Sequence, residues 1–234
     1  MPRVIAVIIA AVLGLSTQPT DNAWAFFVDD LHLAFAQTGR LRDLLRTAAG
    51  ALIQEGDRYL FRASGPSAVS LSNAMTIDRE AIGSTIKFMT GNGLKESDFF
   101  LAPNEEVIYR ANTALDAAEE AVYALTGDAA RLQAIIYVSG GYDVETFPAL
   151  AQRVKAFARR ARENNITIFA IDSRLLGQEL LPDPRVDAAM WERYTSATRR
   201  SLSLMTDGTG GFVIERANEP LVQDLKRIAS QMRQ

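Results

Sequence analysis

Two adjacent carboxylates and the only histidine of this 234-residue chain lie close together, at Asp29, Asp30 and His32. They follow directly on the apolar run Trp24–Val28. Carboxylate oxygens and an imidazole nitrogen can hold a divalent cation or exchange protons with a substrate. Alternatively, the carboxylates accept hydrogen bonds from nearby backbone amides, and His32 is an ordinary hydrogen-bonded side chain. Both interpretations stay open at this stage.

Other polar side chains follow other apolar runs. Ser139 and Asp143 come after Ala134–Val138, and Asp172 comes after Ile166–Ile171. An unbroken apolar run is typical of a strand buried on both faces of a parallel sheet. The carboxyl ends of such strands meet at one edge, where α/β sheets bind their ligands. We therefore expect these groups to lie on a common rim with Asp29.

Strand-like and helix-like segments alternate along the chain, which predicts one α/β domain with a mostly parallel sheet and helices on both faces. Thr38 is the expected N-cap of the first helix. The expected strands are 24–28, 59–63, a short edge strand 69–71, 134–138, 166–171 and 210–214. The expected helices are 38–53, 77–89, 106–125, 147–163, 188–205 and 219–232, with loops at 94–105 and 173–187.

The first residues resemble a secretory signal. Arg3 precedes the uncharged run Val4–Leu15, which is followed by the polar segment Ser16–Asn22. A basic start and a short apolar core favour a signal peptide over residues 1–22, cleaved between 16 and 22, or kept as an anchor. The alternative is an apolar first strand. We expect residues 23–234 to form the exported domain, in the periplasm or outside the cell, without a membrane span.

Composition removes several classes of chemistry. The chain has no cysteine, so thiolate nucleophiles, thiolate metal sites and disulfides are excluded. The net charge of -3 gives no reason to expect a nucleic-acid partner. No phosphate-binding loop or nucleophile elbow occurs. The basic run 153–162 reads as a solvated helix face, or less simply as a site for an acidic partner.

The order of motifs resembles the von Willebrand factor A-type (vWA) fold, and more closely a bacterial family of exported vWA-related proteins. This resemblance covers roughly residues 23–232. The segments that carry it are Phe27–Leu33, Thr38–Leu44, Gly56-Asp57, Ser64–Ser67, Thr90–Lys95, Ile136–Asp143 and Thr209–Phe212. It implies a three-layer Rossmannoid sandwich. Family members usually carry more sequence before the first strand and continue past the final helix, so the resemblance leaves two alternatives, a member shortened at its C-terminus or an imperfect gene start.

Metal-binding vWA domains carry Asp-x-Ser-x-Ser after the first strand, a threonine before a long helix and a later aspartate. The resemblance places Asp29 and Thr113 at the first aspartate and the threonine. Leu31 and Leu33 replace the serines, and Gly140 replaces the later aspartate. Leucine offers no oxygen ligand. The resemblance therefore implies a degenerate metal site and no cofactor, with Mg²⁺ or Ca²⁺ as the alternative.

These observations favour a non-enzymatic protein-interaction or adhesion-type module. A metal-dependent hydrolase using Asp29, Asp30 and His32 is a second hypothesis. A structural envelope protein is the third. The residues expected on the partner-binding rim are Asp29, Asp30, His32, Thr113, Ser139, Asp143 and Asp172.

Overall fold

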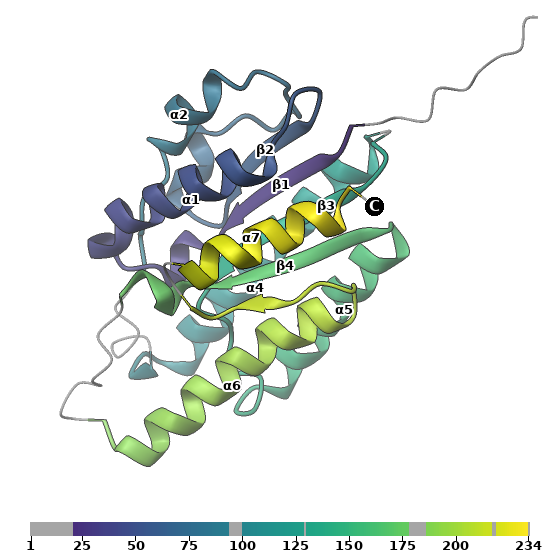
Figure 1. Cartoon of the computed structure of the whole chain (residues 1–234). Coiled ribbons are helices and arrows are strands. Elements are labelled where there is room, and N and C mark those ends of the chain that lie inside the picture. Colours follow the sequence, from purple (N-terminus) through teal and green to yellow (C-terminus); the bar gives the residue numbers. More distant parts are fainter. Residues whose placement is uncertain (1–20, 94–99, 129, 178–185, 217–218, 234) are drawn as a thin grey trace, which may run out of the picture.

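The computed structural model describes residues 21–93, 100–128, 130–177, 186–216 and 219–233 (Figure 1). Within them, five parallel strands form one sheet in the order β2-β1-β3-β4-β5. The strands are β1 (Ala23–Val28), β2 (Arg58–Ala63), β3 (Gln133–Ser139), β4 (Ile166–Asp172) and β5 (Val213–Ile214). The helices are α1 (Thr38–Leu52), α2 (Ala81–Ile86), α4 (Asn104–Thr126), α5 (Pro148–Glu163), α6 (Ala188–Asp207) and α7 (Glu219–Gln231).

Strand β1 is buried along its whole length, and its side chains alternate between two cores. Trp24, Phe26 and Val28 pack into the core beneath α1 and α7. Ala25 and Phe27 pack into the core beneath α4, α5 and α6. Successive side chains of a strand point to opposite faces, so an apolar run without polar breaks suits a strand covered on both sides.

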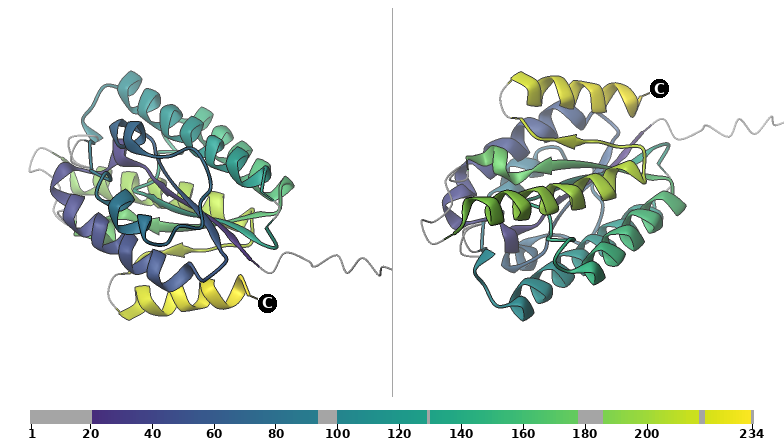
Figure 2. Two further views of the ribbon diagram at one scale, coloured as in Figure 1. Left: turned by 90° about the horizontal axis from the view of Figure 1, so that it is seen from above. Right: turned by 90° about the horizontal axis from the view of Figure 1, so that it is seen from below.

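The helices form two layers around the sheet, α1 and α7 on one face and α4, α5 and α6 on the other (Figure 2). The predicted fold class, a three-layer α/β sandwich with a parallel central sheet and helices on both faces, is confirmed. Strand order reverses between β1 and β3, because β2 lies on one side of β1 and β3 on the other. This is the switch point at which α/β sheets open a crevice. No helix in the described part of the chain is long and apolar enough to cross a membrane.

Several local expectations were wrong. The predicted edge strand 69–71 is instead largely the 3-10 helix η3 (Pro66–Ser70). Sheet pairing beyond β2 is a single antiparallel bridge between Tyr59 and Thr76. Gln37, not Thr38, is the N-cap of α1. At the start of η3, Pro66 after Gly65 favours a tight turn, and this turn outweighs the weak strand signal of the short, half-polar stretch 69–71.

Other boundaries moved inward. Helix α2 covers only the middle of the predicted 77–89 helix, and β5 only the end of 210–214. The 3-10 helix η4 (Ser173–Leu176) opens the expected 173–187 loop. Residues 94–99 and 178–185 of the two expected loops lie outside the described residues.

Two glycines hold the segment after β1 against residues 90–93. A Cβ on Gly91 would lie 2.3 Å from the Ala34 carbonyl oxygen, and one on Gly93 would lie 2.4 Å from that of Leu31. The amide of Gly93 also donates to the Leu33 carbonyl at 2.7 Å. The two backbones approach so closely that only glycine fits.

Replacing Gly91 by alanine should therefore lower the free energy of unfolding by roughly 2 kcal/mol or more, through overpacking against backbone. Gly50 in α1 is the matched control, because a Cβ added there would meet nothing within 4 Å. Gly50→Ala should be neutral or gain about 0.5–1 kcal/mol. Urea denaturation measures both changes. Equal effects of the two substitutions would contradict the close approach.

Candidate functional site

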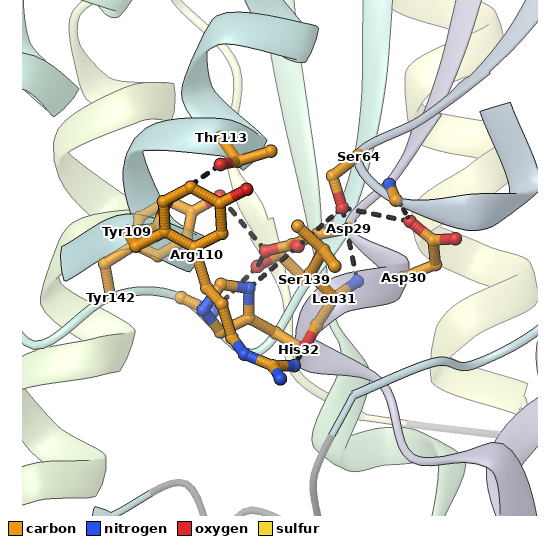
Figure 3. A network of polar contacts seen from close by, with 12 residues as sticks. Asp29, Asp30, Leu31, His32, Ser64, Tyr109, Arg110, Thr113, Ser139 and Tyr142 are labelled. Atoms are coloured by element: carbon orange, nitrogen blue, oxygen red, sulfur yellow. Dashed lines mark hydrogen bonds and ion pairs between the residues drawn. The ribbon is translucent and has the colours of Figure 1, made fainter. Parts of the chain in front are cut away.

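The side chain of Asp29 accepts four hydrogen bonds at the carboxyl edge of the sheet (Figure 3). Its Oδ1 accepts from His32 Nδ1 at 2.8 Å and from Ser64 Oγ at 3.0 Å. Its Oδ2 accepts from Ser139 Oγ at 2.8 Å and from the Tyr142 hydroxyl at 3.1 Å. The donors lie at the end of β3 or just after β1, β2 and β3, so one carboxylate joins the ends of three strands.

These contacts fill the hydrogen-bonding capacity of the group, because a carboxylate offers about four lone-pair positions. Asp29 is fully buried. Burial raises the pKa of Asp29, but the His32 charge and the hydrogen bonds from His32, Ser139 and Ser64 together lower it below 3.8. The carboxylate is therefore ionised, and Nδ1 of His32 carries the proton between them.

Two tyrosines extend the network into the core. The hydroxyls of Tyr137 and Tyr142 are 2.5 Å apart, and Tyr142 also donates to Asp29. Burial and the charge of Asp29 raise the pKa of both tyrosines well above 10. Both phenols therefore keep their protons. The His32 ring meets the Tyr142 ring edge to face, with centroids 5.3 Å apart.

Asp30 is also buried, but it binds different groups. Its Oδ1 accepts from the Gly65 amide at 2.5 Å and lies 3.0 Å from Ser64 Oγ. Its Oδ2 accepts from the Ser67 amide and from Asn92 Nδ2, both at 3.1 Å. Asp30 thus ties the start of η3 and the 90–93 segment to the end of β1. The single Ser64 hydroxyl lies between the two carboxylates and can donate to only one at a time.

The remaining predicted rim residues do not join the Asp29 network. The Thr113 hydroxyl donates to the Tyr109 carbonyl in its own helix at 2.9 Å. Asp143 accepts from the amides of Glu145 and Thr146 through Oδ1. Asp172 pairs with the guanidinium of Arg174, at 2.7 Å from Nη2. The structure therefore brings together Asp29, His32 and Ser139, with Asp30 adjoining through Ser64, and leaves Thr113, Asp143 and Asp172 apart.

This donor set does not fit a divalent cation. A metal ligand needs a free lone pair, and protein donors already occupy both oxygens of Asp29. The Thr113 hydroxyl is bonded within its own helix and is not part of the Asp29 network, and the side chains of Leu31 and Leu33 contain no oxygen. Among the described residues, no group of three His, Asp or Glu side chains is arranged to hold a metal.

Three members of the network were missed from the sequence. Ser64 follows the predicted strand 59–63, so the rule that led to Ser139 and Asp172 would also have found it. Tyr142 is separated from β3 by two glycines, and Asn92 belongs to a turn signal. Nothing in the sequence shows that the side chains of Tyr142 and Asn92 turn back towards Asp29 and Asp30.

No protein-family model matches the chain, and no curated protein matches it either. Among solved structures, the PilB minor pilin from Streptococcus sanguinis aligns with a TM-score of 0.50 at 9% identity, covering 93% of this chain. A mutant of that pilin gives the same TM-score at 10% identity. The SpRpn10 VWA domain aligns with a TM-score of 0.42 at 13% identity, over 92% of this chain and 98% of that one.

The chain spans 62% of the length of the minor pilin. At 9% identity the likeness to that pilin concerns the fold alone. The likeness agrees with the three-layer arrangement that strand order and core packing show, and it assigns no activity to this chain.

Substituting Asp29 by asparagine should destabilise the fold by roughly 2–4 kcal/mol, because an amide nitrogen would face donors that now meet a carboxylate. The stability that the Asp29 carboxylate contributes to the wild-type protein depends on pH. The folded pKa of Asp29 is below its unfolded value, so the stabilisation is complete above about pH 4 and is lost as the pH falls further.

Urea denaturation of the wild type and of Asp29→Asn, at several pH values between neutral and acidic, measures the difference in their free energies of unfolding. The stability difference should shrink as the pH falls through the folded pKa. A difference that stays constant with pH would argue against an ionised, fully bonded Asp29.

Proposed function

We propose that this protein is an exported vWA-like module that binds a protein partner at the carboxyl edge of its sheet without needing a metal ion. The observation that carries the proposal is the complete occupation of the Asp29 carboxylate by His32, Ser64, Ser139 and Tyr142. At the position where a vWA metal site would begin, the chain builds a rigid polar core. The carboxyl edge of the sheet around this core is then the surface that contacts the protein partner.

The same geometry weighs against the hydrolase hypothesis. A metal-dependent hydrolase that uses Asp29, Asp30 and His32 needs free lone pairs on these side chains to hold the cation. Here both oxygens of Asp29 accept hydrogen bonds from protein donors, and Nδ1 of His32 is one of those donors. No described contact favours catalysis, so we propose a non-enzymatic role. A structural envelope protein differs from this proposal only in having no specific partner.

Export is part of the proposal and rests on the basic start and the apolar run Val4–Leu15. Membership of the bacterial family of exported vWA-related proteins is proposed on the motifs that carry the resemblance. The similar fold of a minor pilin agrees with a module of this kind, by fold alone.

Photo-crosslinking in bacterial cells tests the binding surface. Tyr109 and Tyr123 lie on α4 and are 65% and 60% exposed. Tyr109 precedes Arg110, which donates to the Leu31 carbonyl beside the Asp29 network (Figure 3), whereas the Tyr123 hydroxyl accepts from Arg160 on α5. Benzoylphenylalanine at Tyr109 should give a discrete crosslinked partner, and the same probe at Tyr123 should give none. The yield should be equal with a chelator and with millimolar Mg²⁺. Crosslinking only when Mg²⁺ is present would contradict a metal-independent module.

Export can be measured by fusing alkaline phosphatase, which is active only outside the cytoplasm, to the C-terminus. The wild-type fusion should be active. Ile8→Arg places a charge in the apolar run and should abolish activity, whereas Thr17→Arg in the polar segment should not. Full activity of the Ile8→Arg fusion would show that the apolar run is not an export signal.

A further inference from the structure

Two hollows lie side by side among α4, the start of α5 and α6. The first has a volume of about 330 Å³ and is lined in part by Phe100, Asp143, Glu145, Arg193 and Tyr194; we call it the acidic hollow. The second has a volume of about 230 Å³, and we call it the apolar hollow. It is lined in part by Ile108, Asn112, Phe147, Pro148 and Leu150. Thr146 lines both, so the two are neighbours separated by a single residue.

The acidic hollow contains a carboxylate oxygen that the protein does not use. Asp143 is 9% exposed, and its Oδ1 accepts from the Glu145 and Thr146 amides. Its Oδ2 has no hydrogen-bond donor within the described residues. This oxygen is not among the fully buried atoms, so it opens to the hollow, where an ammonium or guanidinium group could donate to it.

The other charges of the acidic hollow favour a cation. Among the described residues of the lining, Glu145 adds a second carboxylate and Arg193 is the one basic side chain. Arg200 approaches Glu145 only to 3.4 Å, and both side chains are at least half exposed, so water screens that pair. Asp143, which is buried and forms no ion pair among the described residues, is therefore the main carboxylate that a bound ammonium or guanidinium group would meet.

Aromatic rings form another wall of the acidic hollow. The rings of Phe100 and Tyr194 meet edge to face with centroids 5.1 Å apart, and Trp191 packs against Tyr194 at 5.6 Å. Aromatic faces attract ammonium and guanidinium groups, and more strongly when water is partly excluded. A carboxylate beside aromatic rings suits the head and the methylene stem of a Lys or Arg side chain.

The apolar hollow suits a different side chain. Ile108, Phe147, Pro148 and Leu150 supply carbon surface, and the side chain of Ile108 stays 37% exposed. The polar groups here are few, and Arg153 is already paired with Asp116. Such a pocket gains free energy mainly by burying an aliphatic or aromatic group.

We propose that the two hollows form one docking groove for an extended peptide segment of a protein partner, with a Lys or Arg side chain in the acidic hollow and an apolar side chain in the apolar hollow. This rests on the proposed interaction function and names the chemistry of its partner. The groove lies beside the Asp29 network, since Asp143 directly follows Tyr142. The network would hold the groove in shape without touching the ligand.

Amide NMR spectra of the full-length chain test the acidic hollow with n-butylammonium and, as a control of equal length and opposite charge, butanoate. Butylammonium should shift the amide signals of Glu145, Thr146 and Ala197, and butanoate should not. Peptides of the form acetyl-Lys-(Gly)n-Phe-amide then test both hollows together. They should bind more tightly than matched peptides with Glu for Lys or Ser for Phe.

Asp143→Asn keeps the Oδ1 acceptor for the two amides and removes the charge, so it should weaken the Lys peptide about fivefold or more. Asp187 caps α6 in the same way but lies outside the linings of both hollows, so Asp187→Asn is the matched control and should change little. Glu145→Gln is a second test in the acidic hollow and should also weaken binding.

Equal shifts with butanoate, or equal binding by wild type and Asp143→Asn, would overturn the groove. If these peptides do not bind but the Tyr109 crosslink still forms, the groove is rejected and the proposed interaction function is retained. Loss of the crosslink would instead reject the interaction function.

Discussion

A buried negative charge on Asp29 constrains the whole carboxyl edge of this domain. An isolated buried carboxylate costs several kcal/mol, and the cost is met only if donors surround it in good geometry. The donors come from the last residue of β3 and from residues that follow β1, β2 and β3. Each of those segments is therefore fixed relative to the others by one side chain. Asp30 extends the same constraint to η3 and the 90–93 segment.

This constraint explains why a fold that commonly offers a ligand crevice at its switch point is filled there. Tyr142 and His32 occupy the space beside the carboxylate, with their rings edge to face and the ring centroids 5.3 Å apart. The open hollows lie to one side, between α4, α5 and α6. Rigid polar packing at the centre and open surface beside it suit a module that presents a contact surface.

The sequence predicted most of the fold because apolar runs such as Ala134–Val138 have few other solutions than a doubly covered strand. It predicted Asp29, His32 and Ser139 at one edge because parallel strands end together. It did not predict that Ser64, distant in sequence, would lie between two carboxylates. Nor could it show that Thr113 would bond to its own helix. Such choices depend on rotamers and on contacts far apart in sequence, which patterns of residue type do not encode.

The central claim is that Asp29 is an ionised structural group with no capacity left for a metal. Its side-chain carboxyl carbon can be followed by NMR as the pH is lowered, with and without millimolar Mg²⁺. The account predicts one titration below pH 3.8, the same in both samples. A midpoint at or above that value, or a carboxyl signal that moves when Mg²⁺ is added at neutral pH, would contradict it.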